Sequence, residues 1–381
     1  MVNLRKYFWV ALNNSLSTNF WAAVHLLRHK VPIEYYLGSG FSFFPDLVTI
    51  LVTLRCNLKC AGCSSESPQK TLEFKARGLN ELTAEEIKKF IGQISSFKPA
   101  IYFNGGEPTL RKDLFELMNY AKKKGLVTVL TTNGSFLTPE AIHQILDSRL
   151  DFFSISLDGP AEYHDEKRGV PGTFLKATTG LKTLIKEREK RKQKFPRIRI
   201  ASIFNPERLE NSKYILDFAN DLGVDELAFG YLMFYTKEAK KRQKEFMKKY
   251  ATGGEEMIGL EIDDRYCFTY DRKKLESFLE LVRKSRVPVV FAPPGVNPEM
   301  FFDTSLWPAK KSRCFSPWFS LTIMPNGDVS PCRGYVVGNI EKEHFLKIWN
   351  NEKMRTFRKM RKKTPFPACF RCGEGQDIKF K

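Results

Sequence analysis

The 381-residue sequence predicts an α/β fold, in which a partial (βα)6 barrel is followed by a small α+β domain. Six strand-like runs, rich in Leu, Val, Ile and Phe, alternate with helical patterns over residues 47–235. Six βα repeats predict a parallel sheet with helices outside it. A hairpin-turn sequence, Pro325-Asn326-Gly327-Asp328, and a helix start at Phe345 follow later in the chain. These two signals predict the small second domain.

The strands and helices can be placed in order along the chain. We expect strands at residues 47–54, 100–104, 126–132, 152–157, 197–203 and 226–234. Thr83-Ala84-Glu85-Glu86 is a capping box that opens one helix, and Thr138-Pro139 opens another with proline in its first turn. Helical periodicity also fills residues 113–124, 173–190, 209–222, 237–250 and about 272–285.

The same patterns divide the chain into four parts. Residues 1–46 form an amphipathic, aromatic-rich N-terminal extension, and residues 47–235 form the barrel. Residues 236–306 are predicted to be a bridging or substrate-covering insert, because their pattern is less regular. Residues 307–381 form the small C-terminal domain.

Three cysteines directly follow the first predicted strand. Cys56, Cys60 and Cys63 have the spacing C-x3-C-x2-C. Three thiolates can hold a four-iron cluster by three corners and leave the fourth iron open to a small ligand, whereas a closed structural metal site normally recruits a fourth protein ligand. The loop after a strand is also where parallel α/β folds place their chemistry.

A glycine pair follows the second predicted strand. Gly105 and Gly106 allow the backbone to come close to a ligand, and the carboxylate of Glu107, together with a fixed carbonyl, suits an ammonium group. Further polar candidates are Asn133 and Ser156, at the ends of the third and fourth strands, and Arg168, in the stretch from His164 to Phe174.

In their order and spacing these motifs resemble the signature of the radical S-adenosylmethionine (radical SAM) superfamily over about residues 47–235. The resemblance implies a [4Fe-4S] cluster on Cys56, Cys60 and Cys63, with SAM bound at the open iron. It implies that Gly105, Gly106 and Glu107 hold the methionyl amine, and that the ribose and carboxylate are contacted by Asn133, Ser156 and Arg168. No catalytic residue is assigned beyond these.

The implied reaction begins when one electron from the reduced cluster cleaves SAM to methionine and a 5′-deoxyadenosyl radical. This radical abstracts hydrogen from an unactivated carbon. The implied partner is a one-electron reductant such as ferredoxin or flavodoxin. The family often has an aromatic residue at the position of Gly62, so contact with adenine is expected from Ile203 or Phe229.

A second cysteine set lies near the end of the sequence. Cys314, Cys332, Cys369 and Cys372, with the hairpin between them, resemble the SPASM and twitch domains of radical SAM enzymes. The resemblance implies an auxiliary [4Fe-4S] cluster, and the nine residues after Cys372 favour the shorter twitch form. Tetrahedral zinc on four cysteines is the alternative. Cys267 belongs to neither set and is expected to be a small buried hydrophobic residue.

The charge is strongly basic. The net charge is +19, from 62 basic and 43 acidic residues, and the basic residues are concentrated at 186–199 and 353–363. Solvated helix faces, an anionic membrane surface and an acidic substrate all agree with this charge. Nucleic acid ranks last, because no helix-turn-helix, RNP or zinc-finger pattern is present.

The N-terminal extension gives two readings. Its aromatic segments with basic flanks suit the plane of a membrane interface, or else they cap the open end of the barrel. No apolar run approaches the ~20 residues needed to span a bilayer. Cysteines that sort into cluster sets, and the lack of a secretory signal, predict a cytoplasmic protein that is peripheral on the inner membrane face in the first reading.

Three functions remain open at this point. We expect a lipid or polyprenyl-type substrate, because the Cys-Ala-Gly-Cys form resembles the branch that acts on hopanoid lipids and the extension suits a membrane. A peptide or protein substrate is the alternative, because the stretch from His164 to Phe174 resembles maturases. The third is a non-catalytic iron–sulfur protein, against which the intact Gly-Gly-Glu-Pro element argues.

Overall fold

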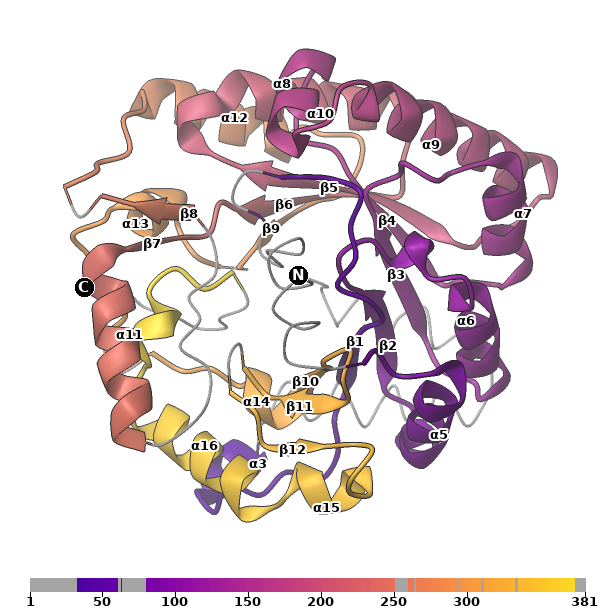
Figure 1. The fold of residues 1–381 in the computed structure, drawn as a ribbon. Coiled ribbons are helices and arrows are strands. Elements are labelled where there is room, and N and C mark those ends of the chain that lie inside the picture. The colour runs from indigo at the N-terminus through magenta and orange to yellow at the C-terminus, as the bar shows by residue number, and fades with distance from the viewer. Residues whose placement is uncertain are drawn as a thin grey trace.

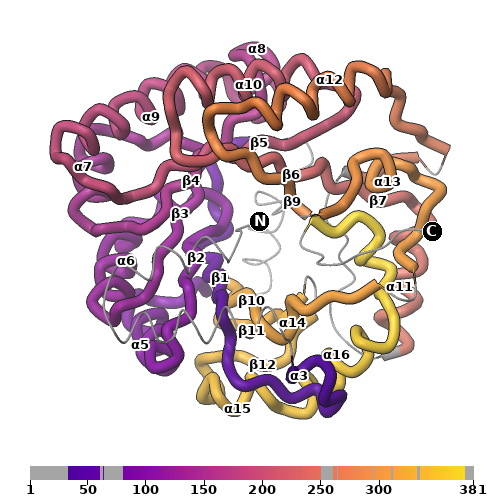
Figure 2. The backbone as a smooth tube through the Cα atoms, turned by 180° about the vertical axis from the view of Figure 1, so that it is seen from behind, coloured from indigo at the N-terminus to yellow at the C-terminus, as the bar shows by residue number. Residues whose placement is uncertain are grey.

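The strands form a curved sheet that lines a ring, and helices cover its outside (Figure 1). The computed structural model describes residues 33–60, 63, 80–250, 260–263, 265–293, 295–309, 312–332 and 335–373. Viewed from behind, the same ring is seen to run from α5 through α12 and to be completed by the C-terminal elements (Figure 2).

Six parallel strands form the centre of a ten-stranded sheet, whose order is β12-β11-β10-β1-β2-β3-β4-β5-β6-β9. Each neighbouring pair from β1 to β6 is parallel, which confirms the predicted βα repeats. The strands are β1 (Leu47–Leu51), β2 (Ala100–Asn104), β3 (Thr128–Thr132), β4 (Phe152–Ser156), β5 (Arg197–Phe204) and β6 (Glu226–Tyr231).

The helices between these strands follow the predicted pattern, except that α8 was not predicted. They are α5 (Ala84–Ile94), α6 (Leu114–Lys123), α7 (Pro139–Asp147), α8 (Ala161–Arg168), α9 (Thr173–Lys190) and α10 (Leu209–Leu222). The capping box at α5 is confirmed, because Thr83 and Glu86 exchange hydrogen bonds between side chain and backbone. The N-cap Thr83 therefore satisfies backbone N–H groups that the first turn leaves without partners.

The region after β6 adds two strands, β8 and β9, that the sequence pattern did not indicate. The last predicted strand, 226–234, is interrupted, because β6 ends at Tyr231 and β7 (Phe234–Thr236) pairs instead with β8 (Leu260–Ile262). β9 (Val289–Ala292) then joins β6 in parallel and extends the sheet. The helices here are α11 (Lys237–Tyr250), α12 (Arg272–Arg283) and α13 (Pro298–Phe302).

The C-terminal domain joins the other edge of the sheet. β10 (Ser320–Ile323) pairs in parallel with β1, and the register places Leu47 opposite Ser320. Gly327, with φ +82°, forms the predicted hairpin turn into β11 (Asp328–Ser330). The remaining elements are α14 (Ser316–Phe319), β12 (Gly338–Asn339), α15 (Phe345–Trp349) and α16 (Glu352–Lys363). This small α+β unit confirms the predicted fold class.

The two faces of the central strands differ in character. Side chains that point toward the helices are almost fully buried and apolar, as Phe103, Leu130 and Ile155 are. Residues that alternate with them, such as Tyr102 and Thr131, are partly exposed and polar. The side chains thus show the period of two expected of strands, with a polar face toward the inside of the ring.

Part of the N-terminal extension packs on the C-terminal domain. Tyr35, in α3 (Ile33–Leu37), is buried against Trp318 with ring centroids 4.9 Å apart. The Ser42 hydroxyl donates to the Trp318 carbonyl oxygen at 2.7 Å. Most of the segment predicted to lie at a membrane falls outside the described residues. Among the described helices, none is both long and apolar enough to cross a membrane.

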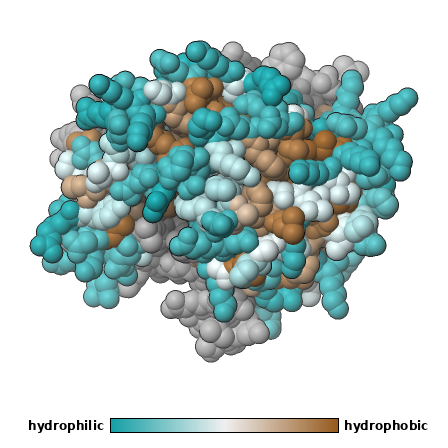
Figure 3. Space-filling model, turned by 90° about the horizontal axis from the view of Figure 1, so that it is seen from above, coloured by the Kyte–Doolittle hydropathy of each residue, from teal (hydrophilic) through white to brown (hydrophobic). Residues whose placement is uncertain are grey.

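The outer surface is mainly polar where it can be seen from above. On the face shown in Figure 3, hydrophilic side chains predominate, and hydrophobic ones occur in small separate areas. The apolar faces of the helices therefore mostly pack on the sheet, as expected of amphipathic helices around a core.

Candidate active site

The first three cysteines lie on the loop that leaves β1. Each of them is partly exposed. The Cys63 N–H donates to the Cys60 carbonyl oxygen at 3.3 Å, and the Leu58 N–H donates to the Cys56 Sγ at 3.5 Å. Burial, together with the nearby Glu107, Cys60 and Cys63, raises the pKa of the Cys56 thiol to about 11, although the Leu58 N–H opposes the shift. The structure therefore brings the three predicted thiols and Glu107 into one neighbourhood.

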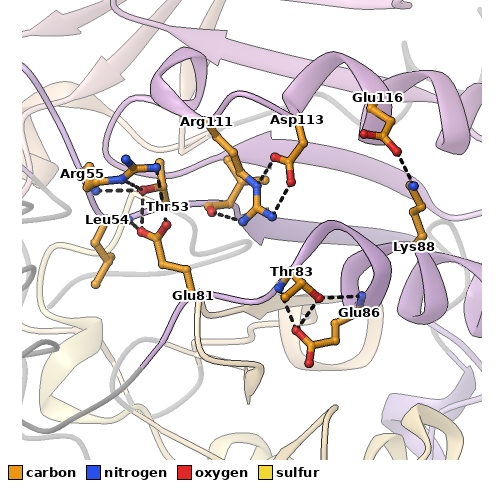
Figure 4. Close-up of polar contacts among 11 residues, drawn as sticks. Thr53, Leu54, Arg55, Glu81, Thr83, Glu86, Lys88, Arg111, Asp113 and Glu116 are labelled. Atoms are coloured by element: carbon orange, nitrogen blue, oxygen red, sulfur yellow. Dashed lines mark hydrogen bonds and ion pairs between the residues drawn. The ribbon is translucent and has the colours of Figure 1, made fainter.

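A carboxylate fixes the start of this loop. Glu81 Oε1 accepts from the Thr53 hydroxyl at 2.5 Å and from the Leu54 N–H at 3.1 Å (Figure 4). Its other oxygen lies 3.7 Å from the guanidinium of Arg55. Because Thr53 to Arg55 join β1 to Cys56, Glu81 fixes the path by which the cysteine loop leaves the sheet.

The glycine pair packs directly against the same residues. The Gly106 N–H donates to the Thr53 carbonyl oxygen and the Glu107 N–H to that of Arg55, both at 2.8 Å. A Cβ at Gly105 would overlap the Thr53 carbonyl oxygen, and one at Gly106 would overlap those of Leu54 and Arg55. Only glycine allows the two loops to come this close.

We predict that Gly106→Ala separates these two loops. The added methyl group meets backbone oxygens that cannot rotate away, so the substitution should cost about 1–3 kcal/mol of stability and weaken SAM binding. Equilibrium binding of SAM to the reconstituted protein measures the second effect. Gly92→Ala is the control, because its Cβ would meet the Tyr120 hydroxyl at an ordinary 3.5 Å. Equal SAM affinity in both variants would contradict the prediction.

Glu107 is a buried carboxylate with four donors. Oε1 accepts from the Thr109 N–H and hydroxyl and from the Thr132 hydroxyl, at 3.1, 2.6 and 2.7 Å. Oε2 accepts from the Asn133 N–H at 2.8 Å. Burial raises the pKa of Glu107, and these donors oppose the shift. Glu107 therefore ties the loop after β2 to the loop after β3.

The two other polar candidates lie at the same end of the sheet. The Asn133 amide donates to the Asn57 side chain at 2.9 Å, so it contacts the cysteine loop directly. Ser156, the last residue of β4, is partly exposed and alternates with the buried Ile155. Of the two residues expected near adenine, Ile203 is partly exposed, whereas Phe229 is fully buried.

The position of Phe229 makes its expected role wrong. Its ring packs on Phe204, Phe278 and Phe291, with centroids 5.5 to 6.1 Å apart. Phe278 belongs to α12, which covers the outside of the sheet. Phe229 therefore contributes to the core under α12 and has no access to a ligand inside the ring.

A buried ion pair connects β4 to the cysteine loop. Arg168 Nη2 donates to Asp158 Oδ2 at 2.6 Å, and its Nη1 lies 3.8 Å from the Cys60 Sγ, in a charge-assisted contact. Asp158 Oδ1 accepts from the Ile203 N–H at 2.8 Å and lies 3.5 Å from the Lys167 ammonium. Although burial opposes it, the nearby Arg168 and Lys167 hold the pKa of Asp158 well below its usual range.

The backbone reinforces this link. The Lys59 N–H donates to the Arg168 carbonyl oxygen at 3.0 Å. Gly169 ends α8 with φ +68°, and a Cβ there would crowd the Lys59 carbonyl. Arg168, predicted to contact SAM, thus lies against Cys60 and binds Asp158 as well.

His164 on α8 should make the stability of the protein depend on pH. It is buried, its Nδ1 accepts from the Asp158 N–H at 3.3 Å, and burial, helped by Arg168, lowers its pKa to about 4. The unfolded chain then binds more protons between the ordinary pKa of about 6.5 and pH 4. The free energy of unfolding should therefore fall by about 2 kcal/mol between pH 7 and pH 5 on account of this residue.

Urea unfolding of the wild-type protein and of His164→Gln at both pH values tests this expectation. Glutamine keeps an acceptor but does not titrate, so the variant should lack this part of the pH dependence. The same loss of stability on acidification in both proteins would contradict it.

The C-terminal cysteines gather around one buried arginine. Cys314 precedes α14, Cys332 follows β11, and Cys369 and Cys372 follow α16. Burial alone would lower the pKa of Arg361, but the thiols of Cys369, Cys314, Cys332 and Cys372 raise it. All four predicted ligands therefore come within electrostatic reach of Arg361, although they lie up to 58 residues apart in the sequence. Cys267 is exposed, so its expected burial is wrong.

Both cysteine sets have the donor chemistry of iron–sulfur sites. Within the described residues, no three Cys, His, Asp or Glu side chains are already packed as around a bound metal ion. Each set is nevertheless a group of thiols beside a guanidinium, that of the largely buried Arg168 for the first set and that of the buried Arg361 for the second. Thiolates ligate such clusters, and a nearby cation compensates their negative charge.

Sequence reasoning missed several of these residues. Glu81, Asp158 and Arg361 were not among the predicted site residues, because each acts through a contact with a distant segment of the chain. Asp158 had a signal, since Asp158-Gly159 ends a strand-like run in the predicted sheet. Glu81 and Arg361 had none that distinguishes them from other charged residues.

Comparison with known proteins gives matches to both halves of the chain. A family model described as the radical SAM superfamily matches residues 50–188, and one described as an iron–sulfur cluster-binding domain (SPASM) matches residues 314–373. The "AdoMet-dependent heme synthase" of Methanosarcina barkeri is 30% identical over 83% of this chain and 85% of its own length. The "PqqA peptide cyclase" of Bradyrhizobium diazoefficiens is 30% identical over 52% of this chain and 49% of its own.

A solved structure has a similar fold. Streptococcus suis SuiB bound to S-adenosylmethionine superposes with a TM-score of 0.59 and 16% identity, over 96% of this chain and 81% of that one. At this level of identity the likeness concerns the fold alone.

Proposed function

Because this protein belongs to the radical SAM superfamily and is an enzyme with iron–sulfur and SAM cofactors, we propose that it acts on a heme-type tetrapyrrole. It would abstract hydrogen from an aliphatic side chain of the macrocycle. The observation that carries this proposal is the relative named as a heme synthase, whose similarity extends over 83% of this chain and 85% of its own length.

The residues that follow β1 and β2 have different expected roles. Cys56, Cys60 and Cys63 would hold the open cluster, which together with SAM supplies the 5′-deoxyadenosyl radical. Gly105 and Gly106 would present backbone to the methionyl amine, since they already keep this loop against the cysteine loop. Glu107 would keep the loop after β3, with Asn133, in position while it contributes negative charge.

Basic side chains near the cysteine loop support an acidic substrate. Arg55 is 52% exposed in its side chain, and Lys59 is exposed as well. Tetrapyrroles of the heme type carry carboxylate side chains, which such cations attract. The partly exposed polar groups on the inner face of the sheet, including the hydrogen-bonded pair of Tyr102 and Thr131, suit the same kind of ligand.

The C-terminal cysteines would hold the auxiliary cluster. The SPASM match supports iron–sulfur chemistry there over zinc. Cys314, Cys332, Cys369 and Cys372 would be its ligands, and a protein with four cysteine ligands leaves no open iron. Radical SAM enzymes need a one-electron reductant, for which we propose a ferredoxin or flavodoxin.

A peptide substrate is the second candidate. The relative named as a peptide cyclase favours it. The stretch from His164 to Phe174, which resembles maturases, has a structural role here, because the Asp165 carboxylate accepts from Gly172 and Phe174 N–H groups at the start of α9. That stretch therefore does not decide between substrates. The predicted lipid substrate and membrane surface depend on residues 1–46, the basic charge and the Cys-Ala-Gly-Cys form. Neither relative reported above is named for a lipid.

The experiment combines binding with turnover. Anaerobically reconstituted protein is mixed with an iron porphyrin that has carboxylate side chains, and the Soret band is followed. We expect the Soret band to shift and the shift to saturate as porphyrin is added. After the protein is reduced, 5′-deoxyadenosine should form only when the porphyrin is present, and the mass of the porphyrin should decrease to a matching extent. SAM cleavage that is indifferent to the porphyrin, without a Soret shift, would exclude this substrate. A peptide or a lipid would then have to be tested, the latter with anionic vesicles.

A further inference from the structure

One arginine in the C-terminal domain is buried without its full set of partners. Arg361 lies on the inner face of α16 with Met354, Phe357 and Arg358, and only 3% of it is exposed. Its Nη1 donates to the Ser312 carbonyl oxygen at 3.4 Å. Its Nη2 has no hydrogen-bond partner in the part of the chain that the structure describes. A buried cationic group in this state is costly unless something anionic compensates it.

The surroundings of Arg361 identify what compensates it. The four cysteines come from three separate segments, before α14, after β11 and after α16. The negative charge of each thiolate raises the pKa of this guanidinium. Ser312, which binds Nη1, lies two residues before Cys314. The guanidinium thus stands where the segments that carry the four sulfurs converge.

The neighbouring Arg358 is buried on the same helix but has different surroundings. It donates to the carbonyl oxygens of Pro317 and Gly40 at 2.8 and 3.0 Å and stacks on Trp349. Arg358 therefore joins segments of the fold, whereas Arg361 lies beside the cysteines.

We propose that Arg361 is the counter-charge of the auxiliary cluster and sets its reduction potential. Four thiolates give the site a negative charge, and reduction adds one more. A fixed guanidinium in a buried position stabilises the more negative, reduced form, and hydrogen bonds to the sulfurs act in the same direction. Arg361 is thus a positioning and tuning residue for the C-terminal cysteines, and the inference rests on the proposed ligand set.

The test compares three variants of the full-length enzyme, reconstituted without oxygen. Arg361→Gln removes the charge, Arg361→Lys keeps it, and Lys359→Gln removes a charge from the exposed face of the same helix. Iron and sulfide are counted, and a redox titration is followed by EPR with SAM present, which shifts the signal of the first cluster away from that of the second. The reduction potential is a readout that a merely structural role would not move.

We expect Arg361→Gln to lower the reduced-to-oxidised ratio of the auxiliary cluster at fixed potential at least about tenfold, or ~59 mV for one electron. Arg361→Lys should restore most of the shift, and Lys359→Gln should show none. If Arg361→Gln loses the iron of the auxiliary cluster, recovery of that iron in Arg361→Lys also supports the role of Arg361 as the counter-charge.

Three results would overturn the inference. One is an unchanged potential in Arg361→Gln with both clusters loaded, and another is a loss of cluster that lysine does not repair. Zinc in place of iron at the C-terminal cysteines would overturn it too. None of these outcomes affects the Soret shift, so the substrate proposal stands or falls separately.

Discussion

Replacing Cys60 by alanine will abolish SAM cleavage while the auxiliary cluster remains. Cys60 lies on the loop after β1 beside Arg168, and it is one of only three thiols in its set. With two cysteines left, the open cluster loses a corner, and about four irons per chain should be lost. We expect 5′-deoxyadenosine formation to fall at least about a thousandfold, equivalent to ~4 kcal/mol in the activation barrier.

Cys267→Ala is the matched control for this experiment. Cys267 is exposed and belongs to neither set, so its removal should leave both iron content and SAM cleavage unchanged. Iron, sulfide and 5′-deoxyadenosine are measured in both variants after anaerobic reconstitution. Full SAM cleavage by Cys60→Ala would show that these cysteines do not form the catalytic site.

Replacing Asp158 by alanine will have the largest effect on stability. The buried carboxylate compensates Arg168 and Lys167 and accepts from the Ile203 N–H. Its removal leaves two largely buried cations, whose side chains are 14 and 17% exposed, without this partner, which typically costs about 3–5 kcal/mol. The loop that carries Cys60 should also lose its support, because Arg168 holds it through both the side chain and the backbone.

The control is an ion pair of similar chemistry in a different environment. Asp217 pairs with Lys213 on α10 at 2.6 Å, but both side chains are more than half exposed, at 55 and 56%. Asp217→Ala should cost less than about 1 kcal/mol. Denaturant midpoints of both variants compare the two sites, and a similar small cost at each would mean that burial does not strengthen the Asp158 network.

The sign of the pH effect at Asp158 follows from its lowered pKa. The carboxylate is favoured in the folded protein, so its contribution is fully present above the ordinary carboxyl pKa of about 3.9. That contribution is lost as the pH falls below this value. The loss of unfolding free energy between pH 7 and pH 5 should therefore come from His164 and not from Asp158.

Local features of the chain were predictable because their causes are local. The strands β1 to β5 begin within two residues of the predicted positions, since runs of buried apolar residues record the two-residue period of a strand. The capping box at Thr83 and the turn at Gly327 were predicted because side-chain caps and positive φ angles depend on a few adjacent residues. The spacing of Cys56, Cys60 and Cys63 belongs to this class as well.

Other features are decided by contacts between distant segments. β9 was missed because its four residues acquire a strand partner only when α12 folds back on the sheet. Phe229 was expected near a ligand because the sequence does not say which face of β6 it occupies. The interruption after Tyr231 likewise depends on the pairing of β7 with β8.

By itself the sequence determined the chemistry of this protein, namely two sets of thiols and the order of strands that presents the first of them. The tertiary structure alone decided which charges stand beside those thiols. Arg168, which binds Asp158, contacts Cys60 across 108 residues of chain, and Arg361 lies within electrostatic reach of cysteines from three segments. The ligands could be predicted from sequence motifs, because the spacing of the cysteines in each motif is local. The charges that compensate buried groups depend on which distant segments the fold brings together.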